Sequence, residues 1–122
     1  MIMDLDTEGT PICVAIAHCS TAAVAGKIDQ AARGGADLAE VRFDTIKGAG
    51  PEFPDKLAAS SDIPLIGTLR SPPEGGDYSG SEDERLDFLT SLGPRGYSMV
   101  DLEAEALSSK KVHENTMARL RE

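Results

Sequence analysis

The clearest pattern in the chain is an alternation of apolar and charged side chains over residues 38–44, Leu-Ala-Glu-Val-Arg-Phe-Asp. Successive side chains of a β-strand point to opposite faces, so Glu40, Arg42 and Asp44 share one face. Charged groups are seldom buried unless they are paired or used, because desolvating a lone ion costs several kcal/mol or more. The pattern fits either the solvated face of an antiparallel strand or a polar interior that faces a ligand.

Strand-like and helix-like segments alternate along the rest of the chain. The predicted strands cover residues 12–17, 38–44, 64–70 and 98–103. Apolar residues at helical spacing predict helices between them, from Ser20 to Gly34, over about 54–60, from Ser81 to Gly93, and in a last stretch with Val112, Met117 and Leu120. Ser81 and Glu84 form a predicted capping box. This order predicts an α/β fold with a parallel sheet covered by helices.

A doubly wound sheet and a (β/α)8 barrel both have this order of elements. No Gly-x-Gly-x-x-Gly follows the first strand and no Gly-x-x-x-x-Gly-Lys occurs, so the nucleotide-binding open sheets are unsupported. A barrel explains the charged strand face, because one strand face lines the interior and active sites lie at the C-terminal strand ends. The inward residues are then Glu40, Arg42, Asp44, Thr68, Arg70, Asp101 and Glu103.

The number of units predicts half of a (β/α)8 TIM barrel. Residues 1–122 are expected to form a single domain of four βα units, the N-terminal half of the barrel. The chain stops at Glu122 inside a helical pattern, without a C-cap glycine or a following strand, so we expect a fragment.

Composition narrows the classes of partner. The chain has 21 acidic and 12 basic residues and a net charge of −9, which disfavours nucleic acid and anionic membranes because both reward basic patches. No apolar run approaches the roughly 20 residues of a membrane span, and the acidic N-terminus argues against a secretory signal. A cytoplasmic location is expected. Cys13 and Cys19 match no redox or zinc spacing, so free, partly buried thiols and no metal site are expected.

Two arginines indicate the chemistry of a ligand. Arg42 and Arg70 end neighbouring strands, and arginine binds carboxylates through paired hydrogen bonds, which suits a small anionic molecule. Glu40 is expected to hold Arg42 in place or to accept substrate hydroxyls. Glu74 lies in the next loop beside glycines, which let a backbone come close to a ligand. An internal salt-bridge network without a ligand is the alternative.

At these residues the chain resembles the type I 3-dehydroquinate dehydratases of the shikimate pathway. The Glu-x-Arg-x-Asp of residues 40–44 resembles the family's second-strand motif, residues 68–76 its third strand and Glu-Gly-Gly loop, and residues 100–103 its fourth strand. These motifs occur in the family's order across about residues 12–105. The resemblance implies a (β/α)8 barrel lyase that removes water from 3-dehydroquinate to give 3-dehydroshikimate, without a metal or an organic cofactor.

The resemblance also implies roles for individual residues. Glu40, Arg42 and Arg70 would bind the substrate. Glu74 would orient a histidine that removes the proton beside the ketone, since such a carboxylate fixes the tautomer. The family's histidine and its Schiff-base lysine are both expected beyond residue 122, so the chain alone is expected to be inactive. Ala15 stands where the family often has a serine, which removes one expected hydrogen bond.

The other candidates do not occupy family positions. His18 and His113 lie elsewhere, Lys47 follows the second strand on the expected site side, and solvated surface is expected for Lys27, Lys56, Lys110 and Lys111. Two alternatives remain open: a stand-alone half-barrel that binds an anionic ligand without catalysis, and another barrel-type lyase or aldolase. Unpaired edges on the first and fourth strands favour self-association, for instance as a homodimer.

Overall fold

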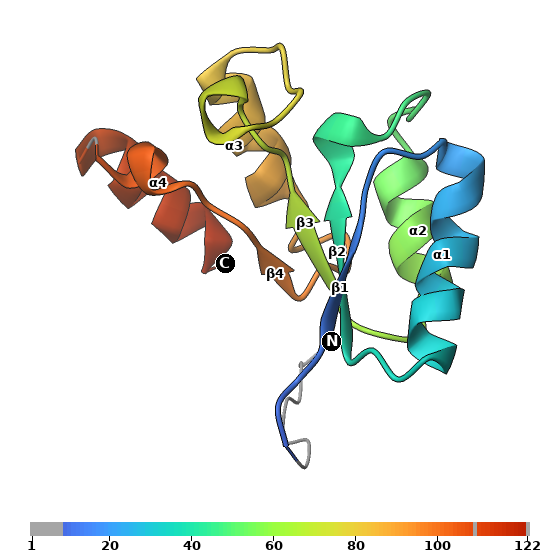
Figure 1. The fold of residues 1–122 in the computed structure, drawn as a ribbon. Coiled ribbons are helices and arrows are strands. Elements are labelled where there is room, and N and C mark those ends of the chain that lie inside the picture. Colours follow the sequence, from blue (N-terminus) through green and yellow to red (C-terminus); the bar gives the residue numbers. More distant parts are fainter. Residues whose placement is uncertain (1–8, 109, 122) are drawn as a thin grey trace.

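The computed structural model describes residues 9–108 and 110–121, and it has the predicted α/β order (Figure 1). Its strands are β1 Cys13–Ile16, β2 Leu38–Arg42, β3 Leu65–Thr68 and β4 Met99–Val100. Its helices are α1 Thr21–Arg33, α2 Phe53–Ser60, α3 Glu82–Ser91 and α4 Lys110–Leu120. Short 3₁₀ turns occupy Phe43–Thr45, Pro72–Glu74 and Ala104–Leu107. The strands are shorter than predicted, and β2 ends at Arg42 because the chain then enters the 3₁₀ turn Phe43–Thr45.

The four strands form one parallel sheet in the order β1-β2-β3-β4. Glu40 lies opposite Ala15 on β1 and Ile66 on β3, and Arg42 lies opposite Thr68. Paired residues of a parallel ladder point to the same face, so the register alone fixes which side chains share a face. The parallel sheet excludes the antiparallel strand that the alternation at residues 38–44 also allowed.

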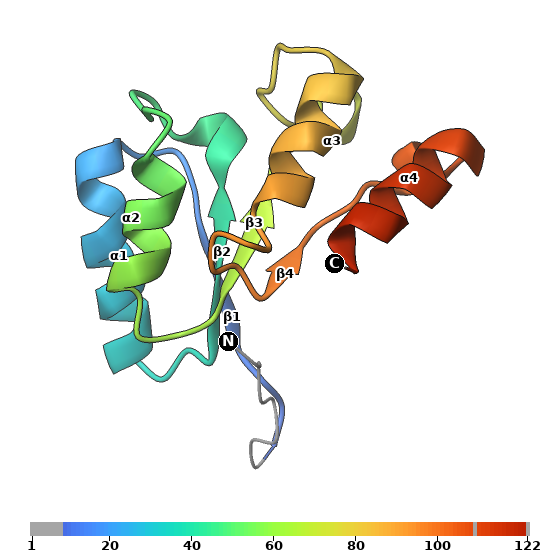
Figure 2. The same cartoon turned by 180° about the vertical axis from the view of Figure 1, so that it is seen from behind.

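The apolar face of the sheet packs against the helices. Ala39 and Val41 are completely buried, and the face that they share with Phe43 belongs to the main hydrophobic core. The helices α1 and α2 lie side by side against this face, and α3 and α4 follow beyond β3 (Figures 1 and 2). Core residues that helical spacing predicts are Val24 and Ile28 of α1, Leu57 of α2, Leu89 of α3 and Leu92 directly after it. Met117 and Leu120 of α4, also predicted, are only partly buried.

The helix ends match the sequence signals in part. The Ser81 side chain accepts a hydrogen bond from the backbone N–H of Glu84 at 3.1 Å, which is one of the two bonds of the predicted capping box. Ser20 occupies the cap position of α1 without a side-chain cap bond. The side chains of residues 110–113 lie outside the described part of the chain, so the expectations for Lys110, Lys111, Val112 and His113 remain predictions. Among the described residues, no helix is long and apolar enough to cross a bilayer.

Candidate active site

The charged side chains of β2 and β3 lie on the sheet face opposite the helix-packed core. Glu40 and Arg42 are half-buried, whereas Ala39 and Val41, which alternate with them along β2, are fully buried against the helices. The Thr68 hydroxyl donates to Glu40 Oε2 at 2.7 Å, across the two strands. The Arg42 and Arg70 side chains each remain 21% exposed. The sheet face predicted for Glu40 and Arg42 is therefore confirmed, and both arginine side chains stay partly accessible on it.

Asp44 is the central acceptor of this face. Its side chain is completely buried. It accepts hydrogen bonds from Arg42 Nε at 3.0 Å and Nη2 at 2.7 Å, and from the backbone N–H groups of Arg70 at 3.1 Å and Asp77 at 3.0 Å. Asp44 therefore holds Arg42 in place, a role that the sequence analysis offered for Glu40.

The protonation of Asp44 follows from these contacts. Burial alone raises the pKa of a carboxyl, because it penalises the charged form. The Arg42 hydrogen bonds, the two backbone N–H donors and the Arg42 charge outweigh burial and hold the pKa of Asp44 below its ordinary value. Asp44 is therefore a permanent anion near neutral pH that anchors Arg42.

Arg70 is paired with carboxylates that follow β4. Its Nη1 lies 2.9 Å from Asp101 Oδ1 and 3.6 Å from Glu103 Oε2. Glu103 is almost fully buried and accepts from the Ser71 backbone N–H at 2.9 Å and from Ser71 Oγ at 2.5 Å. Burial raises the pKa of Glu103, but the Ser71 bonds and the charges of Arg85 and Arg70 hold it below its ordinary value. Arg70 is consequently part of a salt-bridge network, as the alternative interpretation of the sequence allowed, and the structure identifies Asp101 and Glu103 as its partners.

Arg85 is the residue that sequence reasoning missed. It lies on α3 with a side chain only 1% exposed, donates from Nε to Glu82 at 2.8 Å and from Nη1 to the Leu69 carbonyl at 3.1 Å, and has Nη1 3.5 Å from Glu103 Oε2. A signal existed: Arg85 precedes Leu89 by four residues, and so lies on the buried face of the helix.

The loop that carries Glu74 folds back onto Arg70. Glu74 ends the turn Pro72–Glu74 and is exposed, and Gly75 adopts the left-handed conformation with φ +86°. A Cβ on Gly76 would lie 2.1 Å from the Arg70 carbonyl oxygen. Gly76 therefore lets the loop approach the Arg70 backbone closely, whereas the sequence analysis related the loop glycines to a close approach to a ligand.

The remaining candidates lie around this face. Ala15 is exposed opposite Glu40, and His18 after β1 is exposed with φ 54°. Cys13 is exposed rather than partly buried, and Cys19 is half-buried. The described lysine side chains are exposed: Lys27, Lys47 and Lys56. Within residues 9–108 and 110–121, no three or more His, Cys, Asp or Glu side chains gather to hold a metal ion.

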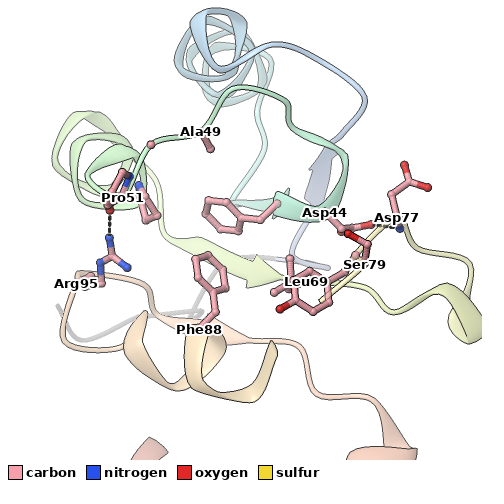
Figure 3. Close-up of a pocket in the computed structure, with 12 residues that line it drawn as sticks. Asp44, Ala49, Pro51, Leu69, Asp77, Ser79, Phe88 and Arg95 are labelled. Atoms are coloured by element: carbon pink, nitrogen blue, oxygen red, sulfur yellow. Dashed lines mark hydrogen bonds between the residues drawn. The ribbon is translucent and has the colours of Figure 1, made fainter. Parts of the chain in front are cut away.

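A hollow of about 710 Å³ lies on the other side of Asp44, between the loops before α2 and α3 (Figure 3). Its walls include Phe43, Leu69 and Phe88, which belong to or pack against the core. Its arginine, Arg95, is paired with Asp55 at 2.8 Å and donates to the Pro51 carbonyl. Among the described residues, every side-chain nitrogen of Arg95 has a partner, since Nη1 also contacts Ser91 Oγ at 3.5 Å. Within the same residues, Arg42 and Arg70 each keep a side-chain nitrogen without one, so the hollow suits an anionic ligand less well than the interior face does.

Comparisons with known proteins identify the family of this chain. The model of the type I 3-dehydroquinase family matches residues 12–120. The chain belongs to the type I 3-dehydroquinase family. The 3-dehydroquinate dehydratase of Methanothermobacter thermautotrophicus is 39% identical over 80 residues, covering 66% of this chain and 36% of that protein. The 3-dehydroquinate dehydratase of Methanoregula boonei is 48% identical over 71 residues, covering 58% and 34%.

A solved structure supports the barrel type. The type I 3-dehydroquinate dehydratase of Clostridium difficile superposes with a TM-score of 0.82 at 22% identity, over 99% of this chain and 51% of that one. The predicted (β/α)8 type is confirmed by this match to a type I dehydroquinase barrel. The chain spans about half of that solved structure and about a third of the two curated relatives.

Proposed function

We propose that this chain supplies the substrate-binding part of a type I 3-dehydroquinate dehydratase active site, in which Glu40, Arg42 and Arg70 bind 3-dehydroquinate. The observation that carries the proposal is the arrangement around Asp44. One buried carboxylate holds the Arg42 guanidinium and the Arg70 backbone at the C-terminal ends of adjacent parallel strands. That is where the barrel fold places active sites.

The arginines keep donors for a ligand after their internal partners are counted. Asp44 takes Nε and Nη2 of Arg42, and the carboxylates after β4 take Nη1 of Arg70. Among the described residues, Arg42 Nη1 and Arg70 Nη2 have no hydrogen-bond partner, so each can donate to an oxygen of an anionic substrate. Glu40 keeps its Oε1 for a substrate hydroxyl while Oε2 accepts from Thr68.

Catalysis needs groups beyond these. The inward positions of the described strands carry no lysine, and Lys47 is exposed in the loop after β2. From the resemblance to the family, we propose that the Schiff-base lysine and the general-base histidine lie beyond residue 122. Glu74, on the loop after β3, is the proposed partner that orients this histidine. The proposed reaction is the dehydration of 3-dehydroquinate to 3-dehydroshikimate.

A binding titration of the chain with 3-dehydroquinate tests the substrate role. Arg70→Ala should weaken binding by about 1.5–3 kcal/mol, the range for hydrogen bonds that involve a charged group. Arg33→Ala is the matched control, because Arg33 forms an exposed pair with Asp29 on α1, on the helix side of the sheet. Equal affinities for the two variants would reject the role of Arg70.

Assembly and location extend the proposal. The edges β1 and β4 have no neighbouring strand in the described sheet, and unpaired edges favour pairing with another chain. We propose that the 122-residue chain, taken as a single domain, forms a homodimer in isolation, which light scattering would measure. We propose a cytoplasmic location, and the net charge of −9 disfavours nucleic acid and anionic membranes as partners.

A further inference from the structure

We propose that Glu103 is a positioning residue of the substrate-binding face: it fixes the backbone at Ser71 and so sets the place of Arg70 and of the Glu74 loop. This inference rests on the proposed function, because it concerns how the binding residues are held. Neither the family motifs nor the comparisons assign a role to Glu103.

The backbone N–H groups of Arg70 and Ser71 each donate to a carboxylate, one that follows β2 and one that follows β4. The Arg70 N–H donates to Asp44 Oδ1 at 3.1 Å, and the next N–H, of Ser71, donates to Glu103 Oε2 at 2.9 Å. The Ser71 hydroxyl adds a bond of 2.5 Å to Glu103 Oε1. Asp44 follows β2 and Glu103 follows β4, so the end of β3 is clamped by carboxylates from both neighbouring strands. The position of the Arg70 side chain depends on this clamp.

Glu103 is itself kept in place as a charged group. Its side chain is 4% exposed, and the equally buried Arg85 guanidinium lies 3.5 Å away. A carboxylate removed from water to this extent persists because it is paired and hydrogen-bonded on both oxygens. Arg85 in turn is held by Glu82 and by the Leu69 carbonyl, one residue before Arg70. The helix α3 is thereby tied to the same short segment.

Ser71 also begins the loop that carries Glu74. The Ser71 carbonyl accepts from the N–H groups of Glu74 at 3.1 Å and of Gly76 at 2.9 Å. The backbone N–H of Tyr78 donates a hydrogen bond to the Arg70 carbonyl oxygen at 3.2 Å. A shift of Ser71 therefore moves the turn as a unit. Losing Glu103 is expected to loosen Arg70 and Glu74 together, although neither side chain is altered.

The test compares Glu103→Gln with Glu105→Gln, the same chemical change at an exposed glutamate two residues away. The measurements are the affinity for 3-dehydroquinate and the hydrogen exchange of the Ser71 amide. We expect Glu103→Gln to weaken binding about tenfold and to accelerate Ser71 exchange, while Glu105→Gln changes neither. In an Arg70→Ala background, Glu103→Gln should weaken binding much less, because Glu103 acts on Arg70 both through Ser71 and by its direct contact with Nη1 at 3.6 Å, and coupled residues are not additive. The Ser71 exchange isolates the route through the backbone.

Three results would overturn the inference: unchanged binding in Glu103→Gln, fully additive losses with Arg70→Ala, or Ser71 exchange equal in the two glutamine variants. If Glu103→Gln does not fold, Ser71→Ala removes only the hydroxyl bond and should weaken binding about threefold, and unchanged affinity would then refute the role. If the wild-type chain does not bind 3-dehydroquinate, the proposed function fails. The Ser71 exchange then decides the positioning role by itself.

Discussion

Replacing Asp44 by asparagine should be among the most damaging single changes in the chain. The side chain is completely buried and accepts four hydrogen bonds, two from Arg42 and two from backbone N–H groups. Asparagine has the same shape but carries no charge, and its NH₂ group would face donors. Arg42 and one or more N–H groups would then lose their acceptor.

The magnitude follows from the burial of the two partners. Removing one member of a buried ion pair costs about 3–5 kcal/mol. Arg42 keeps 21% of its side-chain surface, so water can solvate it in part, and we expect a loss of about 2–4 kcal/mol in the free energy of unfolding. With a urea m-value of about 2 kcal/mol/M, the unfolding midpoint should fall by about 1–2 M.

The pH dependence gives a second and independent signature. The folded-state pKa of Asp44 lies below its ordinary value, so its stabilising contribution is present above the unfolded pKa, about 3.9. That contribution is lost as the pH falls through the lower folded pKa. The wild-type chain should therefore lose stability in acid more steeply than Asp44→Asn does.

Urea unfolding followed by circular dichroism, repeated from pH 7 down to pH 3, measures both effects. Asp62→Asn is the control, because Asp62 is an exposed carboxylate between α2 and β3. A midpoint for Asp44→Asn within about 0.3 M of that control would refute the reasoning, since such a shift is worth less than about 1 kcal/mol. An equal loss of unfolding free energy between pH 7 and pH 3 in Asp44→Asn and in the wild type would also refute the reasoning.

Two further predictions concern the loop and the nucleophile. Gly76→Ala should destabilise the chain and weaken substrate binding, because the new Cβ would lie 2.1 Å from the Arg70 carbonyl oxygen. The control Gly26→Ala in α1 should be neutral or stabilising, because nothing lies within 4 Å of its new Cβ. A higher thermal unfolding midpoint for Gly76→Ala than for Gly26→Ala would contradict this prediction. Borohydride reduction in the presence of 3-dehydroquinate should leave the 122-residue chain unmodified, as measured by mass spectrometry. The reason is that a Schiff-base lysine needs burial or a nearby charge to lose its proton near neutral pH. A one-to-one adduct would show that the chain contains a nucleophile, with Lys47 as the first candidate.

The sequence predicted the fold and the face of the site because both follow from local periodicity. The alternation at residues 38–44 has a period of two residues, so it predicts opposite faces for Arg42 and Val41 without any knowledge of tertiary contacts. The cap at Ser81 was predictable for the same reason, since its partner Glu84 is three residues away.

The contacts that hold the site could not be predicted in this way. Asp44 was expected as one more inward strand residue, but the chain leaves β2 at Arg42, and Thr45 Oγ1 closes the turn on the Arg42 carbonyl at 2.8 Å. The bond from Ser71 to Glu103 joins residues 32 positions apart, and it depends on how the end of β3 is packed beside the segment after β4. No spacing in the sequence records that packing.

The proposed function requires that the interior face around Arg42 and Arg70 binds the anionic substrate. The most direct measurement is a ¹⁵N chemical-shift titration of the chain with 3-dehydroquinate. The largest changes should occur at the amides of Glu40, Arg42, Arg70 and Ser71, while Phe88 and Arg95 at the hollow near α2 and α3 change little. Shifts centred on Phe88 and Arg95, or the absence of saturable shifts at the end of β2 and β3, would contradict the account.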